Sequence, residues 1–185
     1  MHTITRRTTI AGLLAPLVAG ASASGAQAAS AGEIDAGVDH TMRVFFDQVH
    51  GSRELVRKAA AVLVFPNVIK AGMGIGGEYG EGALLIRGRP VEYYNTVSAS
   101  IGFQLGAQAR SIIIAFMTPE ALYGFRRVDG WKVGVDGSVA LVTVGIGGSI
   151  DTSRLASPIV GFIFDGKGLM YNLTLEGSKI SRIHR

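Results

Sequence analysis

Residues 61–82 read AVLVFPNVIKAGMGIGGEYGEG, and the character of the chain changes at this stretch. A compact apolar run ends at Pro66-Asn67, and glycine then recurs at short intervals between β-branched and aromatic residues. Such a pattern is typical of strands that bend sharply or that pack closely against a bare backbone. From here to the C-terminus we expect strands at 61–65, 71–79, 82–87, 92–96, 100–108, 111–117, 131–137, 139–145, 148–152, 159–165 and 168–176.

One helix interrupts these strands. Thr118 can cap its N-terminus, Pro119 suits the first helical position, and the helical pattern continues to Arg126. Asp136-Gly137 and Asp165-Gly166 are hairpin-type dipeptides, because both residue types tolerate the positive φ of tight turns.

Before residue 61 the chain is helical. Apolar residues recur at spacings of three and four, which places them on one helix face. These residues are Ile34, Val38, Met42, Phe45, Phe46 and Val49. A second short helix follows over SRELVRKAA, and Ser52 is its candidate cap. The sequence therefore predicts an α+β protein: N-terminal helices, then a strongly curved or closed, mainly antiparallel β-sheet with one inserted helix.

Residues 1–28 have the plan of an export signal. Arg6-Arg7 lies in a short head, an apolar run follows, and an A-x-A motif ends at Ala28. The paired arginines favour the twin-arginine route over general secretion. We expect cleavage after Ala28, one domain over 29–185, and a periplasmic or secreted location.

Removal of this leader also changes the charge. The chain has 18 Lys and Arg against 14 Asp and Glu, a net charge of +4, and the leader holds two of the arginines and no acid. The remaining 16 basic and 14 acidic residues give +2, so we expect no nucleic-acid partner.

The residues of common catalytic and metal sites do not assemble into a motif. The chain has no cysteine, which excludes disulfides, thiolate metal sites and cysteine nucleophiles. Its 72–77 segment satisfies G-x-G-x-x-G, but no helix start follows to bind a pyrophosphate. The histidines after the leader, at 40, 50 and 184, lack ligand spacing, and the serines lack a G-x-S-x-G elbow. We expect no enzyme, no cofactor and no metal.

A basic cluster is the candidate binding site. Arg53, Arg57 and Lys58 lie on the second helix, and Lys70 follows the first strand. The apolar residues near this group are Leu55, Val56 and Val62. Basic residues beside apolar ones can bind an anionic lipid surface, with about 1 kcal/mol of attraction per residue. A solvated helix face is the alternative interpretation.

The run 64–82 strongly resembles the signature of SYLF-domain proteins, a lipid-binding family that includes eukaryotic actin-patch regulators and exported bacterial members. The resemblance continues through 100–108, 116–118, 132–138 and 168–178, and so covers nearly all of 29–185. The chain departs from the common family pattern at 87–90 and 98–100, so we carry over no ligand specificity.

The resemblance implies a non-enzymatic domain that binds membranes, with phosphoinositide preference in eukaryotic members and actin binding in some. The family's amphipathic lipid-binding segment corresponds to 51–61, and Lys70 falls on the family's lysine before the glycines. We therefore expect an anionic lipid or membrane surface as the partner, and do not expect actin for an exported bacterial protein. An envelope structural or assembly module that meets another envelope protein is the alternative function.

Overall fold

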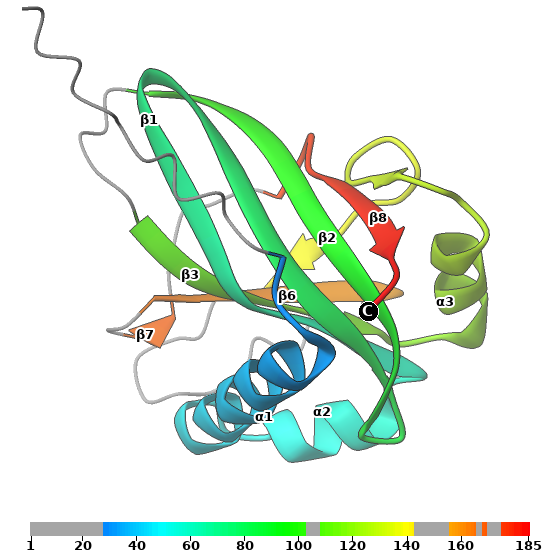
Figure 1. Cartoon of the computed structure of the whole chain (residues 1–185). Coiled ribbons are helices and arrows are strands. Elements are labelled where there is room, and N and C mark those ends of the chain that lie inside the picture. The colour runs from blue at the N-terminus through cyan, green and yellow to red at the C-terminus, as the bar shows by residue number, and fades with distance from the viewer. Residues whose placement is uncertain (1–27, 103–107, 143–155, 166–167, 170–174) are drawn as a thin grey trace, which may run out of the picture.

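The computed structural model of the chain describes residues 28–102, 108–142, 156–165, 168–169 and 175–185. Within them, helices precede and interrupt a single sheet, so the α+β prediction is confirmed (Figure 1). The elements in chain order are α1 (Ala31–Gln48), α2 (Ser52–Lys58), β1 (Ala61–Ile86), β2 (Arg89–Gly102), β3 (Gln108–Phe116), α3 (Pro119–Arg126), β4 (Trp131–Lys132), β5 (Ala140–Leu141), β6 (Ile159–Asp165), β7 (Gly168–Leu169) and β8 (Lys179–Ile183).

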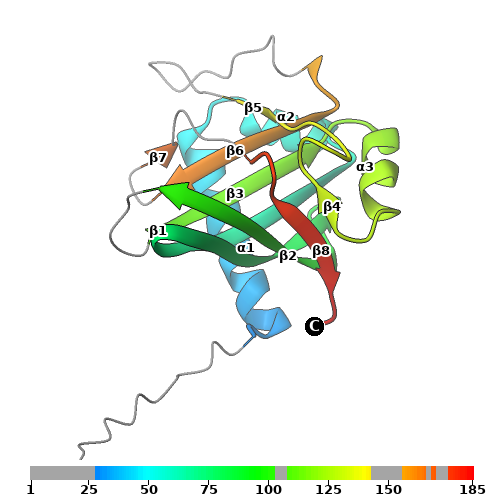
Figure 2. The same cartoon turned by 90° about the horizontal axis from the view of Figure 1, so that it is seen from above.

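The sheet is strongly curved and mostly antiparallel. Its strands follow the order β4-β8-β2-β1-β3-β6-β5, with β7 beside β6. Among the described strand pairs, β5 with β6 is parallel and the others are antiparallel. Figure 1 shows α1 and α2 side by side on one face, and in Figure 2 α3 lies with β4 at one end of the sheet.

The longest strand, β1, doubles back on itself. Its first part pairs with β3 and its second part with β2, and the ribbon rises and returns in Figure 1. A Cβ at Gly82 would clash with the backbone oxygen of Val64, so glycine lets the two arms of β1 approach. We expected separate strands at 61–65, 71–79 and 82–87. Pro66-Asn67 instead shifts the register between Phe65 and Val68 without ending the strand.

Both faces of the sheet are covered. Successive β1 side chains point to opposite faces, so each face has its own apolar cluster. Val62 and Val64 pack with the buried face of α1, while Leu63 and Phe65 pack with Phe125 and Trp131. The predicted apolar face of α1 is confirmed. Its buried members are Ile34, Val38, Met42, Phe45 and Val49, and Phe46 is half-buried.

Side-chain caps begin two of the helices. Ser30 and Glu33 form a reciprocal capping box at α1. Thr118 accepts a hydrogen bond from the Ala121 amide at 3.2 Å, which confirms the predicted cap of α3. The predicted Ser52 cap is wrong: Gly51 is the N-cap of α2, with φ of 83°, and Ser52 lies buried in the first turn.

The C-terminal half differs most from the sequence prediction. We expected a strand over 131–137, but β4 ends at Lys132 because the chain turns there, with Asp136 accepting from the Lys132 amide at 2.7 Å. Strand β8 was not predicted. The expected strand 148–152 lies outside the described residues, as do parts of 100–108, 139–145 and 168–176, and Gly166 of the second dipeptide.

Candidate functional site

A pocket of about 580 Å³ opens where α1, α2 and the turn between β1 and β2 meet. Apolar side chains contribute much of its lining, and four arginines with one aspartate contribute its charges. The apolar members are Met42, Phe46, Val56, Ala59, Ala61, Val62 and Leu85, and the charged ones are Asp39, Arg43, Arg53, Arg57 and Arg87. We call this the arginine pocket. Its charge balance, four cations against one anion, is strongly positive compared with the chain as a whole.

Helix geometry brings three of the arginines together. Arg53 and Arg57 are four residues apart on α2, which places them on the same face. Arg43 lies on α1 one turn before Phe46, and the Arg53 guanidinium sits 4.5 Å from the centre of the Phe46 ring. A cation–π contact of this kind contributes roughly 0.5–1 kcal/mol and favours this position of the guanidinium.

The fourth arginine stands in an unusual backbone conformation. Ile86 pairs with Arg89, so Arg87 and Gly88 are the two central residues of the hairpin turn. Both have positive φ, 52° and 76°, which is the type I′ geometry. Glycine adopts it freely, whereas the left-handed conformation costs arginine about 1 kcal/mol. The type I′ turn requires this conformation at both central positions, and it places Arg87 at the edge of the arginine pocket.

The four residues predicted from the sequence do not form one group. Arg53 and Arg57 line the arginine pocket, whereas Lys58 turns to Glu54, with Nζ 2.8 Å from Oε1 and both side chains more than half exposed. Lys70 lies eight residues beyond Val62 on β1, about 25 Å along the strand. Its ammonium is 3.8 Å from the carboxylate of Glu78, which also pairs with Arg110.

Sequence reasoning missed Arg43 and Arg87. The first could have been found, because it precedes Phe46 by three residues on the predicted helix. The second could not, since its place depends on how β1 and β2 pair beneath α2.

The electrostatics favour an anion in the arginine pocket. The hydrogen bond from Lys58 and its charge, followed by the charge of Arg57, hold the pKa of Glu54 below its ordinary value. Glu54 is thus a carboxylate whose hydrogen-bonded partner is Lys58, while Arg57 lines the pocket. Guanidinium groups pair well with phosphate and carboxylate oxygens, and the apolar lining accepts hydrocarbon. The arrangement suits an amphiphile with an anionic head.

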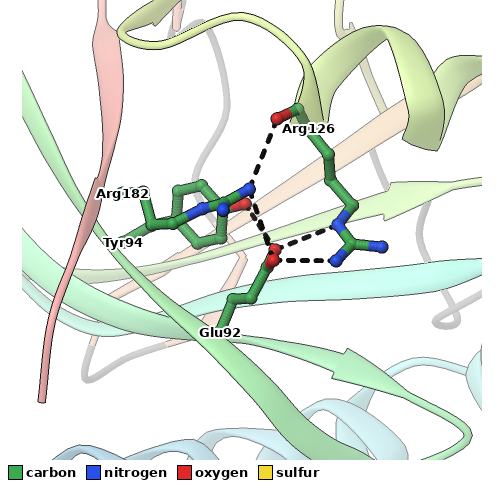
Figure 3. A network of polar contacts seen from close by, with 4 residues as sticks. All are labelled: Glu92, Tyr94, Arg126 and Arg182. Carbon is green, nitrogen blue, oxygen red and sulfur yellow. Dashed lines mark hydrogen bonds and ion pairs between the residues drawn. The ribbon is translucent and has the colours of Figure 1, made fainter.

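A second polar cluster is centred on Glu92, whose carboxylate is paired with neighbouring side chains (Figure 3). The Glu92 carboxylate on β2 accepts from Arg126 of α3 at 2.7 and 3.0 Å, and from the Tyr94 hydroxyl at 2.7 Å. Arg182 of β8 lies 3.3 Å from the same carboxylate. Burial, and then the hydrogen bond to Glu92, raise the pKa of Tyr94 to about 12. This network joins α3 and β8 to β2.

Other kinds of site find little support in the described part of the chain. No cluster of three or more His, Asp or Glu residues there could hold a metal ion. None of the described helices is long and apolar enough to cross a membrane.

The chain matches the model of a known protein family. Residues 97–184 match the family model Ysc84, whose description is "Las17-binding protein actin regulator". The matched region runs from β2 to β8, and the residues of the arginine pocket precede it. No curated protein matches the chain.

Proposed function

The chain belongs to the SYLF-domain (Ysc84) family, and from this premise we propose that it is an exported, non-enzymatic domain that binds anionic phospholipid surfaces. Family membership by itself supports a binding domain of the lipid- or actin-related kind. The choice of a lipid surface rests on the arginine pocket. An export signal at 1–28 would place the mature domain in the periplasm or outside the cell, where it could meet a phospholipid surface.

The observation that carries the proposal is the convergence of four arginines on an apolar pocket. Stable attachment to a membrane surface generally needs two signals, such as buried apolar area together with basic residues. Each basic residue near anionic headgroups contributes about 1 kcal/mol. Four arginines would therefore supply roughly 4 kcal/mol at low salt, and side chains such as Phe46 and Val56 would supply the apolar contact.

Two details favour this interpretation over a solvated helix face. The Arg53 residue is exposed, but its guanidinium lies over the Phe46 ring, beside the apolar lining of the pocket. Arg87 lies at the edge of the arginine pocket in a backbone conformation that is unfavourable for its residue type. The first feature places a cation beside apolar side chains, and the second keeps an arginine where the turn itself would favour asparagine or glycine.

Vesicle co-sedimentation tests the proposal. We would compare phosphatidylcholine vesicles with vesicles that also contain phosphatidylglycerol, at about 0.1 M and about 1 M salt, where the Debye length falls from about 10 Å to about 3 Å. We expect binding to the anionic vesicles at low salt and its loss at high salt. Equal recovery with neutral and anionic vesicles would contradict the proposal.

A pair of variants locates the contact. Arg53→Gln/Arg57→Gln removes two charges from the arginine pocket and should weaken binding about 30-fold, from about 1 kcal/mol per charge. Arg127→Gln/Lys132→Gln removes two charges from exposed positions beside α3 and β4, and should leave binding unchanged. Equal weakening by both pairs would mean that only the net charge matters. Pull-down of an envelope protein that survives the first pair would favour the assembly function instead.

A further inference from the structure

The residue that follows the A-x-A motif is bound to a buried carboxylate. The backbone nitrogen of Ala29 donates to Oε2 of Glu81 at 3.2 Å, across 52 positions of the sequence. The side chain of Glu81 is only 7% exposed. Ala29 is half-buried, whereas Ala28 is exposed, so the peptide bond between them lies at the surface.

The Glu81 carboxylate is built to accept positive charge. Its Oε1 accepts from the Tyr79 hydroxyl at 2.6 Å and pairs with Arg185 near the C-terminus. Burial raises the pKa of Glu81, but the hydrogen bonds from Tyr79, Arg185 and Ala29 outweigh it and hold the pKa below its ordinary value. Glu81 is therefore ionised at neutral pH, with one oxygen shared by Tyr79 and Arg185 and the other facing Ala29.

The chain is fixed in place immediately beyond this point. Ser30 caps α1, its amide donates to Glu33 at 2.8 Å, and the capping box is complete. Because α1 is capped at Ser30, the Ala29 nitrogen takes no part in the cap, and it donates to Glu81.

We propose that a signal peptidase cleaves the bond between Ala28 and Ala29 and that Glu81 binds the resulting α-ammonium group as an ion pair. Water supplies hydroxyl to the Ala28 carbonyl carbon and a proton to the Ala29 nitrogen, and the new amine takes up a further proton because its ordinary pKa is about 8. One neutral N–H donor thus becomes a cation at the same position. Maturation would lock the new N-terminus onto β1.

Several charged or titratable groups face this point, and the test must allow for them. Ala29 and Glu81 line a second pocket, of about 990 Å³, between α1, β1 and β3. Together with Glu81, the charged or titratable groups at this point are Glu33, His40, Tyr79 and Arg110 of the pocket lining, and Arg185 from the C-terminus. Only Glu81 among them is bonded to the Ala29 nitrogen.

The first measurement is the intact mass of the full chain after export, for which we expect an N-terminus at Ala29. The second is thermal unfolding of the processed chain and of the full-length chain retained in the cytoplasm. We expect the processed chain to melt about 2–4 °C higher, the shift typical of a partly buried ion pair in a domain of this size. In Glu81→Gln this difference should fall to within about 1 °C, while the exposed control Glu120→Gln should keep it.

A third readout does not depend on the folding of a variant. The pKa of the Ala29 α-amine in the processed wild-type chain, from the pH dependence of its acylation rate, should lie about one unit above its ordinary value of about 8. An N-terminus at another residue, an α-amine that titrates at its ordinary value, or an equal melting difference in Glu81→Gln would overturn the proposal. It rests on the proposed export and not on lipid binding, so vesicle assays can fail without affecting it.

Discussion

Replacing Glu92 by glutamine should lower the melting temperature at neutral pH by about 4–8 °C. Glu92 is 14% exposed at its side chain and joins β2 to α3 and β8 through Arg126 and Arg182 (Figure 3). Hydrogen bonds to charged groups contribute about 1.5–3 kcal/mol each. The two arginines are 41% and 44% exposed and would regain water, so the net loss should be about 2 kcal/mol, not the sum.

The same carboxylate predicts a dependence on pH. Burial raises the pKa of Glu92, but the hydrogen bonds from Arg126 and Tyr94 and the two guanidinium charges lower it below its ordinary value. A carboxyl group with a depressed pKa stabilises the fold above its unfolded pKa, about 4.3, and that contribution is lost as the pH falls through the folded pKa. Wild type and Glu92→Gln should therefore converge in stability at acid pH.

Thermal unfolding followed by circular dichroism, near pH 7 and at about pH 3, measures both effects. The matched control is Glu54→Gln, because Glu54 pairs with Lys58 while both side chains are more than half exposed. Such an exposed pair contributes at most about 1 kcal/mol, so the control should melt within about 2–4 °C of wild type. If Glu92→Gln were no less stable than Glu54→Gln, or kept its full deficit at acid pH, the reasoning would be refuted.

The remaining stability predictions concern backbone space and helix capping. Gly82→Ala should cost at least about 2 kcal/mol, because its Cβ would meet the backbone of Val64 and backbone cannot move aside as a side chain can. Gly124→Ala, in α3 with no atom near the added Cβ, should instead stabilise by about 0.5–1 kcal/mol. Ser30→Ala should cost about 1 kcal/mol by removing the capping box with Glu33. Chemical denaturation checks all three, and equal effects at the two glycines would contradict the close approach of the β1 arms.

The sequence predicts best what is decided locally. The buried face of α1 follows from a spacing of three and four residues, and the start of α3 from Thr118 and Pro119. The glycine-rich run predicts that the sheet is curved, because glycine among β-branched residues is typical of strands that bend sharply. Each of these features is decided by residues that are close together in the sequence.

Features that depend on distant pairing are harder to predict. β1 continues past Pro66 because the register shift places that residue where no ladder hydrogen bond is needed, and only the β3 partner reveals this. β8 is five residues long and its burial depends on β2 and β4. Lys70 is close to α2 in sequence but far from it along β1. Arg87 is distant from α2 in sequence, yet it lines the arginine pocket together with Arg53 and Arg57.

The proposal that the arginine pocket faces the membrane is tested most directly by the position of the bound protein on a vesicle. Anionic vesicles that carry a nitroxide-labelled lipid broaden the amide signals of residues close to the headgroups. We predict the strongest broadening at Arg53, Arg57 and Gly88, and none along α3. Broadening centred on α3, or spread evenly over the domain, would contradict the proposed site.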